Sequence, residues 1–108
     1  MSGFDDRGKA NENKFAHDSE LEFKANARRN KLVGEWAAKH MGLEGDAVAA
    51  YAKEVVIADM EEKGDEDVFR KLRQDLTAKN VDLSDHQIRR EMESFLAIAR
   101  EQVRTEAK

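Results

Sequence analysis

Apolar residues recur along this chain at the three- and four-residue spacing of α-helices, and glycine or capping residues separate the runs. The first run has Ser19 and Glu22 at its start, which is the pattern of a capping box. Its apolar stripe consists of Phe23, Ala27, Val33, Ala37 and Met41, widened by Leu32 and Trp36. Gly42 suits the left-handed residue that ends such a helix, so we predict a helix over residues 19–41.

A second helix is predicted over residues 46–63. Asp46 is a suitable capping residue at its start, and Gly64 follows its end. Its apolar positions are Val48, Ala52, Val55 and Val56, with Tyr51 beside them.

A third helix is predicted over residues 65–79, opened by Asp65 and stopped by Asn80 in a left-handed conformation. Its apolar stripe consists of Val68, Phe69, Leu72 and Leu76. Its acids precede its bases, an order that suits the helix dipole. The expected i,i+4 ion pairs are Glu66 with Arg70 and Asp67 with Lys71.

The fourth helix is predicted over residues 84–106, because Ser84 and Gln87 form a second capping box. Leu83 is placed to pack against Ile88 as a hydrophobic staple. The apolar stripe consists of Ile88, Met92, Phe95, Ile98, Ala99 and Val103.

Short connectors favour antiparallel neighbours, so residues 19–108 are expected to fold as a compact four-helix bundle. One long coiled coil would need heptads that continue through Gly42, Gly45 and Gly64, and the sequence has none. Proline is absent and turn-forming sequence is scarce, which leaves little from which to build strands. The predicted fold class is therefore all-α. The side chains expected in the core include Trp36, Phe69, Leu72, Phe95 and Ile98.

Residues 1–18 differ from the rest, because they are almost entirely polar or small apart from Phe4 and Phe15. So polar a segment cannot bury enough apolar surface to fold alone. The two rings are close to three helical turns apart, however, so a helix would align them on one side. We predict a flexible, partly helical segment. The pattern alone leaves open whether it is a frayed tail or a helix that forms on a partner.

Composition limits the classes of function. The 108 residues suffice for one domain, and there is no cysteine for disulfides, thiolate zinc sites or cysteine nucleophiles. Charged residues make up 39% of the chain, yet the net charge is only −4, which argues against a nucleic-acid binder. The sequence shows no signal peptide and no apolar run near the roughly 20 residues of a membrane span. We therefore expect a soluble, cytoplasmic protein without direct membrane insertion.

Catalytic and metal-binding patterns are missing from the sequence. None of the histidines, His17, His40 and His86, follows a glutamate at the spacing that di-iron bundles use. Two of the four serines are explained as caps, and no glycine-rich phosphate loop precedes a lysine. We therefore predict that the protein is not an enzyme, has no catalytic or metal-binding residues and requires no cofactor.

One basic cluster allows a different kind of site. Lys24, Arg28 and Lys31 share a helical flank, with Arg29 beside them, and Trp36 lies about two turns further along. Such a cluster can bind a phosphate group through charge-assisted hydrogen bonds, or it can be an ordinary solvated helix face. The basic runs at 69–73 and 88–90 allow the same two interpretations.

Two longer stretches, "FAHDSELEFKANARRNKLVGEWAA" (15–38) and "GDEDVFRKLRQDL" (64–76), resemble a known family. The chain is similar over essentially its full length, including "FDDR" at 4–7, to the ζ subunit that regulates the F-type ATP synthase of α-proteobacteria. This resemblance implies a four-helix bundle that inhibits ATP hydrolysis by the catalytic head of the synthase.

The resemblance also implies a role for the N-terminal segment. Residues 1–18 would be a mobile inhibitory element that enters an interface of the catalytic α and β subunits, with the central stalk as a further partner. The contact residues implied are Phe4, Asp5, Asp6, Arg7, Lys14 and Phe15. The protein would then lie at the inner membrane only through its association with the synthase.

Members of this family are also held to bind ADP or ATP as a regulatory ligand. The resemblance therefore favours phosphate binding at the basic cluster, with Lys24, Arg28, Arg29, Lys31 and Trp36 as the expected site. An alternative function follows from this, in which the bundle senses the nucleotide and the N-terminus is a passive tail.

Overall fold

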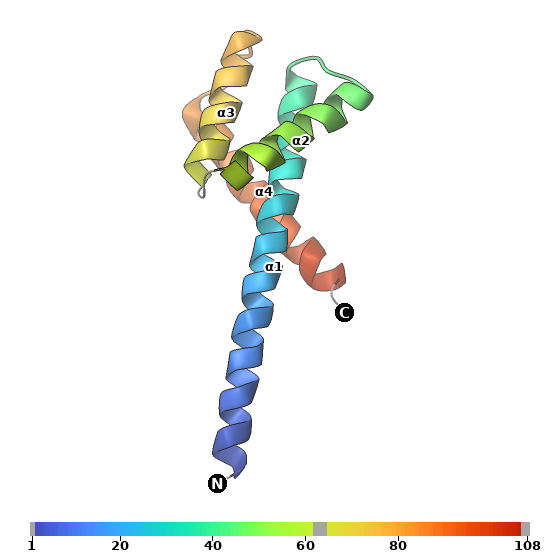
Figure 1. Ribbon diagram of the computed structural model, residues 1–108. Helices are drawn as coiled ribbons and strands as arrows, with labels where there is room; N and C mark the ends of the chain where they lie inside the picture. The colour runs from blue at the N-terminus through green and yellow to red at the C-terminus, as the bar shows by residue number, and fades with distance from the viewer. Residues whose placement is uncertain (1, 62–64, 107–108) are drawn as a thin grey trace.

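Helix α1 (Ser2–His40) organises the molecule in the computed structural model, and the other three helices pack around its C-terminal half (Figure 1). These are α2 (Asp46–Glu61), α3 (Asp65–Ala78) and α4 (Asp85–Glu106). The structure describes the backbone of residues 2–61 and 65–106, and side chains over 19–59 and 65–106. The predicted all-α fold with four packed helices is confirmed.

The start of α1 differs from the prediction, because the helix begins at Ser2 and passes through Ser19 without interruption. Ser19 is therefore not a helix cap, although it has the capping-box partner Glu22. No glycine or proline lies between Lys9 and Asp18 to end the helix. At 39 residues α1 is about 58 Å long, and its first half extends beyond the other helices (Figure 1).

The helix ends largely follow the predicted signals. Gly42 and Asn80 have φ values of 83° and 59°, so both are in the left-handed conformation expected of them. Each is part of a Schellman motif, in which the N–H of the next residue donates to a carbonyl five positions back, at 3.0 Å for Leu43 and 2.9 Å for Val81. Asp46 lies in the first turn of α2 and is not its cap, because Gly45, with φ 58°, provides the carbonyl that starts this turn.

Both bonds of the second capping box are formed. The backbone N–H of Ser84 donates to Gln87 Oε1 at 2.8 Å, and the N–H of Gln87 donates to Ser84 Oγ at 3.1 Å. Leu83 packs against the buried cluster that contains Ile88, as expected of a staple residue.

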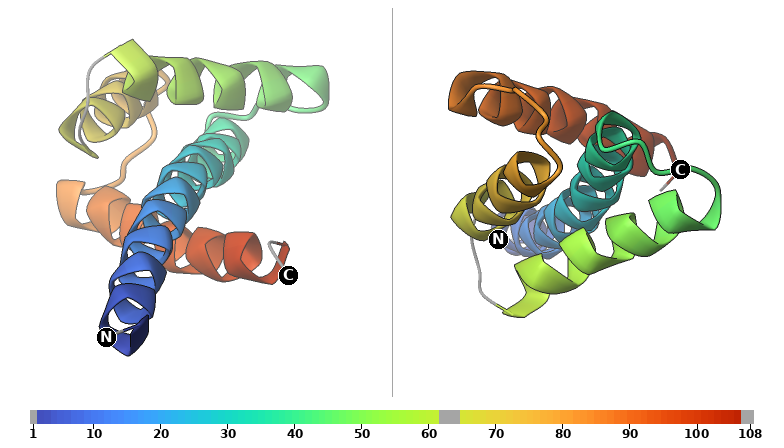
Figure 2. Two further views of the ribbon diagram at one scale, coloured as in Figure 1. Left: turned by 60° about the horizontal axis from the view of Figure 1, so that its bottom comes forward. Right: turned by 90° about the horizontal axis from the view of Figure 1, so that it is seen from above.

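The four helices surround a common core (Figure 2). Helix α1 lies between α2 and α4, and α3 contacts all three of these helices. The main cluster of buried side chains includes Val33, Tyr51, Val55, Val68, Leu72, Leu76, Ile88 and Met92. A second cluster joins α1 to the C-terminal half of α4 and consists of Ala25, Ala99 and Val103, with Leu21, Leu32 and Leu96 packed against it. This second cluster fixes the point at which α1 leaves the packed part of the molecule.

The predicted core is partly corrected. Leu72 is fully buried, whereas Trp36, Phe69 and Phe95 are only partly buried. Ile98 is 46% exposed, because it lies about 100° around α4 from the buried Ala99. Phe23, expected in the apolar stripe of α1, is 70% exposed.

The exposure of Phe23 has a simple cause. Asn30, two turns further along the same side of α1, contacts Asp59 near the C-terminal end of α2. Phe23 therefore lies past the described end of α2, where none of the described helices covers that side of α1.

The ion pairs of α3 also differ from those predicted. Arg70 pairs with Asp67 at 3.2 Å, and the expected partner of Arg70, Glu66, pairs with Arg89 of α4 at 2.9 Å. The other ion pairs described for this helix are Asp65 with Arg29 of α1, Lys71 with Asp75 and with Glu54 of α2, and Arg73 with Asp85 of α4. The two predicted pairs are therefore replaced by other local pairs, Asp67 with Arg70 and Lys71 with Asp75, and by pairs that join α3 to its neighbours.

Candidate functional site

The six residues expected to contact a partner, Phe4, Asp5, Asp6, Arg7, Lys14 and Phe15, lie outside the range of described side chains. The backbone over residues 2–18 is helical and continues directly into the packed part of α1. No glycine lies between Lys9 and Asp18, so Lys14 and Phe15 are joined to the bundle without such a hinge, whereas Gly8 separates residues 4–7 from it.

The basic residues expected to bind phosphate do not face one common site, because their side chains contact different helices. Arg29 is only 2% exposed, and its guanidinium donates to Asn30 Oδ1 at 2.6 Å and to Asp65 Oδ1 at 2.9 Å. Asn30 in turn donates to Asp59 Oδ2 at 2.8 Å. This chain of hydrogen bonds connects α1 to the C-terminal end of α2 and to the first residue of α3. The donors of Arg29 thus have partners within the fold.

Arg28 faces the opposite neighbour of α1. Its two terminal nitrogens donate to the carboxylate of Glu106 at 2.6 and 2.7 Å, and one of them also donates to Gln102 Oε1 at 3.0 Å. This fork geometry is the strong form of an arginine–carboxylate contact. The Glu106 carboxylate raises the pKa of Arg28, and the Arg28 guanidinium lowers the pKa of Glu106.

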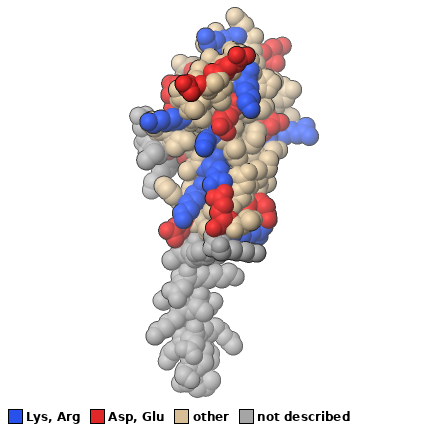
Figure 3. All heavy atoms as spheres, turned by 90° about the vertical axis from the view of Figure 1, so that its right-hand side faces the viewer, with Lys and Arg blue, Asp and Glu red and all other residues tan. Residues whose placement is uncertain are grey.

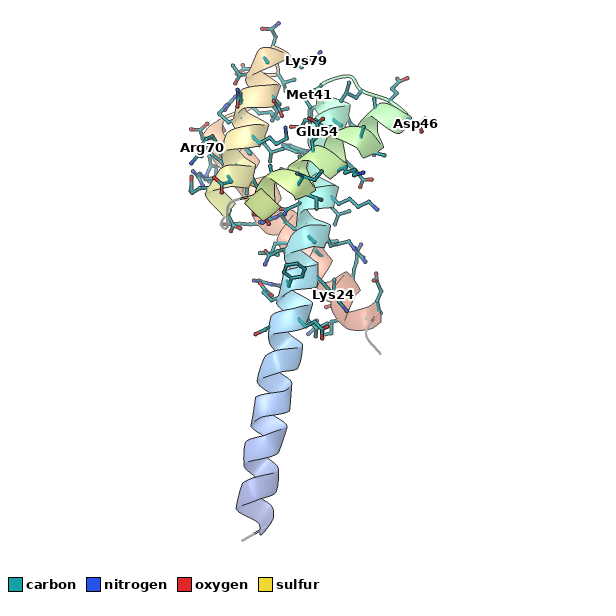
Figure 4. All side chains as sticks on the ribbon, viewed as in Figure 1. Lys24, Met41, Asp46, Glu54, Arg70 and Lys79 are labelled. Carbon is teal, nitrogen blue, oxygen red and sulfur yellow. The ribbon has the colours of Figure 1, made fainter. Side chains whose placement is uncertain are left out.

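The remaining members of the predicted cluster are Lys24, Lys31 and Trp36. Both lysines are exposed, and Lys24 lies on α1 next to the C-terminal part of α4 (Figure 4). Trp36 is partly buried, and its ring meets that of His40 edge to face at a centroid distance of 4.8 Å. The structure therefore brings Lys24 and Arg28 to the α1–α4 side but turns Arg29 toward α2 and α3.

Trp36 instead contributes to a hollow of about 470 Å³ between α1 and α4. Leu32 and Phe95 supply further apolar surface, while Lys39 and His40 supply basic groups. Glu35 adds an acidic group to the same lining. Aromatic surface next to the ammonium group of Lys39 is the part of the hollow that suits a planar anion. Neither Lys39 nor His40 was singled out as a site residue from the sequence.

A second set of contacts joins α1 to α4 where the projecting half of α1 begins. The Glu22 carboxylate accepts from Arg100 at 2.6 Å, and this hydrogen bond lowers the pKa of Glu22. Together with the pair between Arg28 and Glu106, this gives two ion pairs, one on each side of the apolar cluster around Ala25. The base of the projecting helix is therefore held to α4 by apolar packing and by exposed charge pairs.

Charge is mixed on the face of the molecule that Figure 3 shows. Acidic and basic side chains alternate there without a large area of one sign. Within the described part of the chain, no cluster of three or more metal-ligating His, Cys, Asp or Glu residues is present. The helices described there also include none long and apolar enough to cross a membrane.

Sequence reasoning missed the residues that orient Arg29. Asn30 and Asp59 are 29 positions apart, and neither follows a recognisable motif. Asp65 was identified as the start of α3 but not as a partner of Arg29. The one available signal was that Arg29 lies close to the apolar stripe of α1, where an unpaired charge would be unfavourable.

These features define an all-helical protein in which one long helix projects from a small bundle. A family model described as ATPase inhibitor subunit zeta matches residues 1–102. The chain belongs to this family of inhibitors of the F-type ATP synthase, whose members are regulatory proteins and not enzymes. Membership implies inhibition of ATP hydrolysis and association with the synthase.

A comparison with solved structures agrees with this assignment. A protein whose solution NMR structure is known shares 46% sequence identity with this chain, with a TM-score of 0.70. The match covers 80% of this chain and 98% of the other. No curated protein sequence matches this chain.

Proposed function

We propose that this protein inhibits ATP hydrolysis by inserting residues 1–18 of α1 into an interface between catalytic α and β subunits of the ATP synthase. The observation that supports this most strongly is the continuous helix from Ser2, whose first half extends beyond the bundle (Figure 1). The protein would act in the cytoplasm, bound to the synthase at the inner membrane. The central stalk is a further contact for a helix that reaches far enough into the head.

The dimensions fit such a mechanism. Residues 2–18 form a helix about 26 Å long, enough to reach deep between two subunits. Its polar composition provides little reason for it to pack on its own bundle, so a partner surface supplies the contacts. Obstruction of a catalytic interface requires no catalytic group from the inhibitor.

The experiment is inhibition of ATP hydrolysis by full-length variants at a series of concentrations. We expect Phe4→Ala and Phe15→Ala each to weaken inhibition by roughly 1–3 kcal/mol, because each removes an aromatic anchor from the interface. Asp5, Asp6, Arg7 and Lys14 would contribute at the polar rim and have smaller effects. Full inhibition by the Phe4→Ala/Phe15→Ala double variant would disprove insertion.

A second candidate function is the sensing of ADP or ATP by the bundle, with the N-terminus as a passive tail. The hollow next to Trp36, Lys39 and His40 favours this candidate, because it combines aromatic and basic groups. Lys24, Arg28, Arg29 and Lys31 remain the residues predicted from the sequence, although the fold already provides partners for both arginines.

The single tryptophan provides the test. Titration with ADP should change the fluorescence of Trp36 if the base lies in this hollow, and the binding should weaken with added salt. Amide shifts confined to residues 24–31 would instead support the predicted basic cluster. The absence of any change at millimolar ADP would eliminate nucleotide sensing.

A further inference from the structure

Phe23 is the most exposed large apolar side chain among those that the structure describes. It is 70% exposed, compared with 46% for Ile98 and 44% for Ile57. It lies five residues past the end of the projecting segment, which places it about 7.5 Å further along the helix axis. A single exposed apolar side chain is common on protein surfaces, so the significance of Phe23 lies in the apolar surface that it shares with its neighbours.

The ring lies at the edge of a hollow of about 520 Å³, which residues of α1 form together with Val103 and Glu106 of α4. Apolar side chains supply most of its lining, namely Leu21, Phe23, Ala27 and Val103. Val103 belongs to the buried cluster that joins α1 to α4, so this surface is continuous with the interior. The hollow is large enough to accept one apolar side chain of a partner.

The charged groups at its edge do not oppose such a contact. Arg28 and Glu106, which also line the hollow, already form a two-bond ion pair with each other. Lys24, which is exposed, is the third charged residue of the lining. A contact confined to the apolar centre leaves all three charged groups in water, so it does not incur the cost of burying them. An apolar centre with a polar, solvent-accessible rim is the usual arrangement of a strong contact point in protein interfaces.

The position of the hollow identifies its occupant. From Leu21 onward, the apolar cluster and the two ion pairs hold α4 against α1. Because α4 widens the molecule at this point, the cleft of the synthase that receives residues 1–18 must end near Leu21. The protein surface that borders this cleft then lies next to Phe23. We infer that the Phe23 hollow is a second contact surface, which takes up an apolar side chain of the ATP synthase at the entrance of that cleft. This inference rests on the proposed insertion of residues 1–18.

The test compares full-length Phe23→Ala with Ile57→Ala, a matched change of an exposed apolar residue on α2. We expect Phe23→Ala to raise the half-inhibitory concentration for ATP hydrolysis about tenfold or more, and Ile57→Ala to change it less than about twofold. Phe23→Leu, which keeps an apolar side chain, should recover most of the inhibition. Inhibition by Phe23→Ala equal to that of the unmodified protein would overturn the inference.

The Phe4→Ala/Phe15→Ala variant separates this inference from the proposed function. Loss of inhibition in that variant, with normal inhibition by Phe23→Ala, means that insertion holds and the second contact does not. Normal inhibition in that variant, with weak inhibition by Phe23→Ala, means that the second contact holds and insertion does not.

A cross-linking experiment checks the same surface without removing the aromatic ring. A photoreactive phenylalanine derivative at position 23 should link to the synthase, as should one at position 15, while one at position 57 should not. A link from position 15 without one from position 23 would also overturn the inference.

Discussion

The two sides of α1 are packed in different ways. Toward α2 the helices approach so closely that a Cβ added at Gly34 would lie 2.8 Å from Ala52 Cα, and the buried Asn30 donates to Asp59. Toward α4 the contact consists of larger apolar side chains, such as Leu21 and Leu32, flanked by exposed ion pairs.

This difference shows which contacts determine the fold and which only support it. Small residues at a close helix crossing allow one geometry, because any added volume meets backbone atoms. Exposed ion pairs tolerate small displacements and contribute little to stability. Substitutions on the α2 side should therefore lower the free energy of unfolding strongly, and those on the α4 side only slightly. This should hold even when the residue replaced is an arginine on both sides.

The largest effect is expected for Arg29→Ala, which should lower the free energy of unfolding by about 2–4 kcal/mol. The change removes a buried side chain and leaves Asn30 Oδ1 without its donor, whereas Asp65 is exposed and can be hydrated. Such a loss is a large part of the roughly 5–15 kcal/mol typical of small domains.

Arg28→Ala is the matched control, because it removes the same side chain one position away. We expect a loss of no more than about 1 kcal/mol, since Arg28 is partly exposed and pairs with an exposed carboxylate. Urea unfolding of both variants measures the difference. Equal effects of the two substitutions would show that the sides of α1 are not packed differently.

The next effect concerns the close approach itself. Gly34→Ala should destabilise the protein by about 1–3 kcal/mol, even though alanine is the better helix former by about 1 kcal/mol. The added methyl group would meet Ala52 Cα at 2.8 Å and Val55 Cγ2 at 3.2 Å.

Second-site changes identify the atom responsible. Ala52→Gly should not rescue Gly34→Ala, because the nearest atom is a Cα that glycine retains. Val55→Ala should relieve only the weaker contact and would add a cavity of its own. A Gly34→Ala variant more stable than the unmodified protein in thermal unfolding would contradict the close crossing.

The same comparison explains how much could be predicted from the sequence. Helix stops and the second capping box were identified correctly, because Gly42, Asn80 and Ser84 act through local backbone geometry. The start of α1 was not, because a capping box at Ser19 does not end a helix that no glycine or proline interrupts between Lys9 and Asp18. The exposure of Phe23 was not either, because it depends on where α2 ends. Local patterns do not contain that information.

The candidate site divides in the same way. The basic cluster was read as one helical flank, but the partners of Arg28 and Arg29 come from opposite neighbours of α1. The Trp36 hollow includes Phe95, which is 59 positions away in sequence, so helical spacing alone could not have found it. Contacts between helices decided which side chains share a site.

A smaller effect is expected for the ion pair between Glu22 and Arg100 on the α4 side. A double-mutant cycle with Glu22→Gln and Arg100→Gln should give a coupling free energy of about 0.2–1 kcal/mol, because both side chains are about half exposed. Raising the salt concentration should reduce it further. A coupling of several kcal/mol would indicate that this side is as tightly specified as the α2 side.

The smallest effect is the pH dependence of that coupling. The pKa of Glu22 lies below its ordinary value of 4.5, mainly because Arg100 donates a hydrogen bond to it, with Arg29 adding to the shift and burial and Asp65 opposing it. A carboxyl whose pKa is lowered in the folded state stabilises the protein above its unfolded pKa, and this stabilisation is lost as the pH falls through the folded pKa. The coupling measured by urea unfolding should therefore be the same at pH 7 and pH 6, and it should decrease only below about pH 4.5. The control is Glu22→Gln, which has no charge at this position and so removes the contribution of Glu22 to the pH dependence. The pH response of the other carboxylates remains in this variant. They include Glu66 and Glu106, whose pKa values are also lowered by arginine partners. A coupling that is unchanged at pH 3 would mean that Arg100 does not depend on the charge of Glu22, and that apolar packing alone holds α4 to the base of the projecting helix.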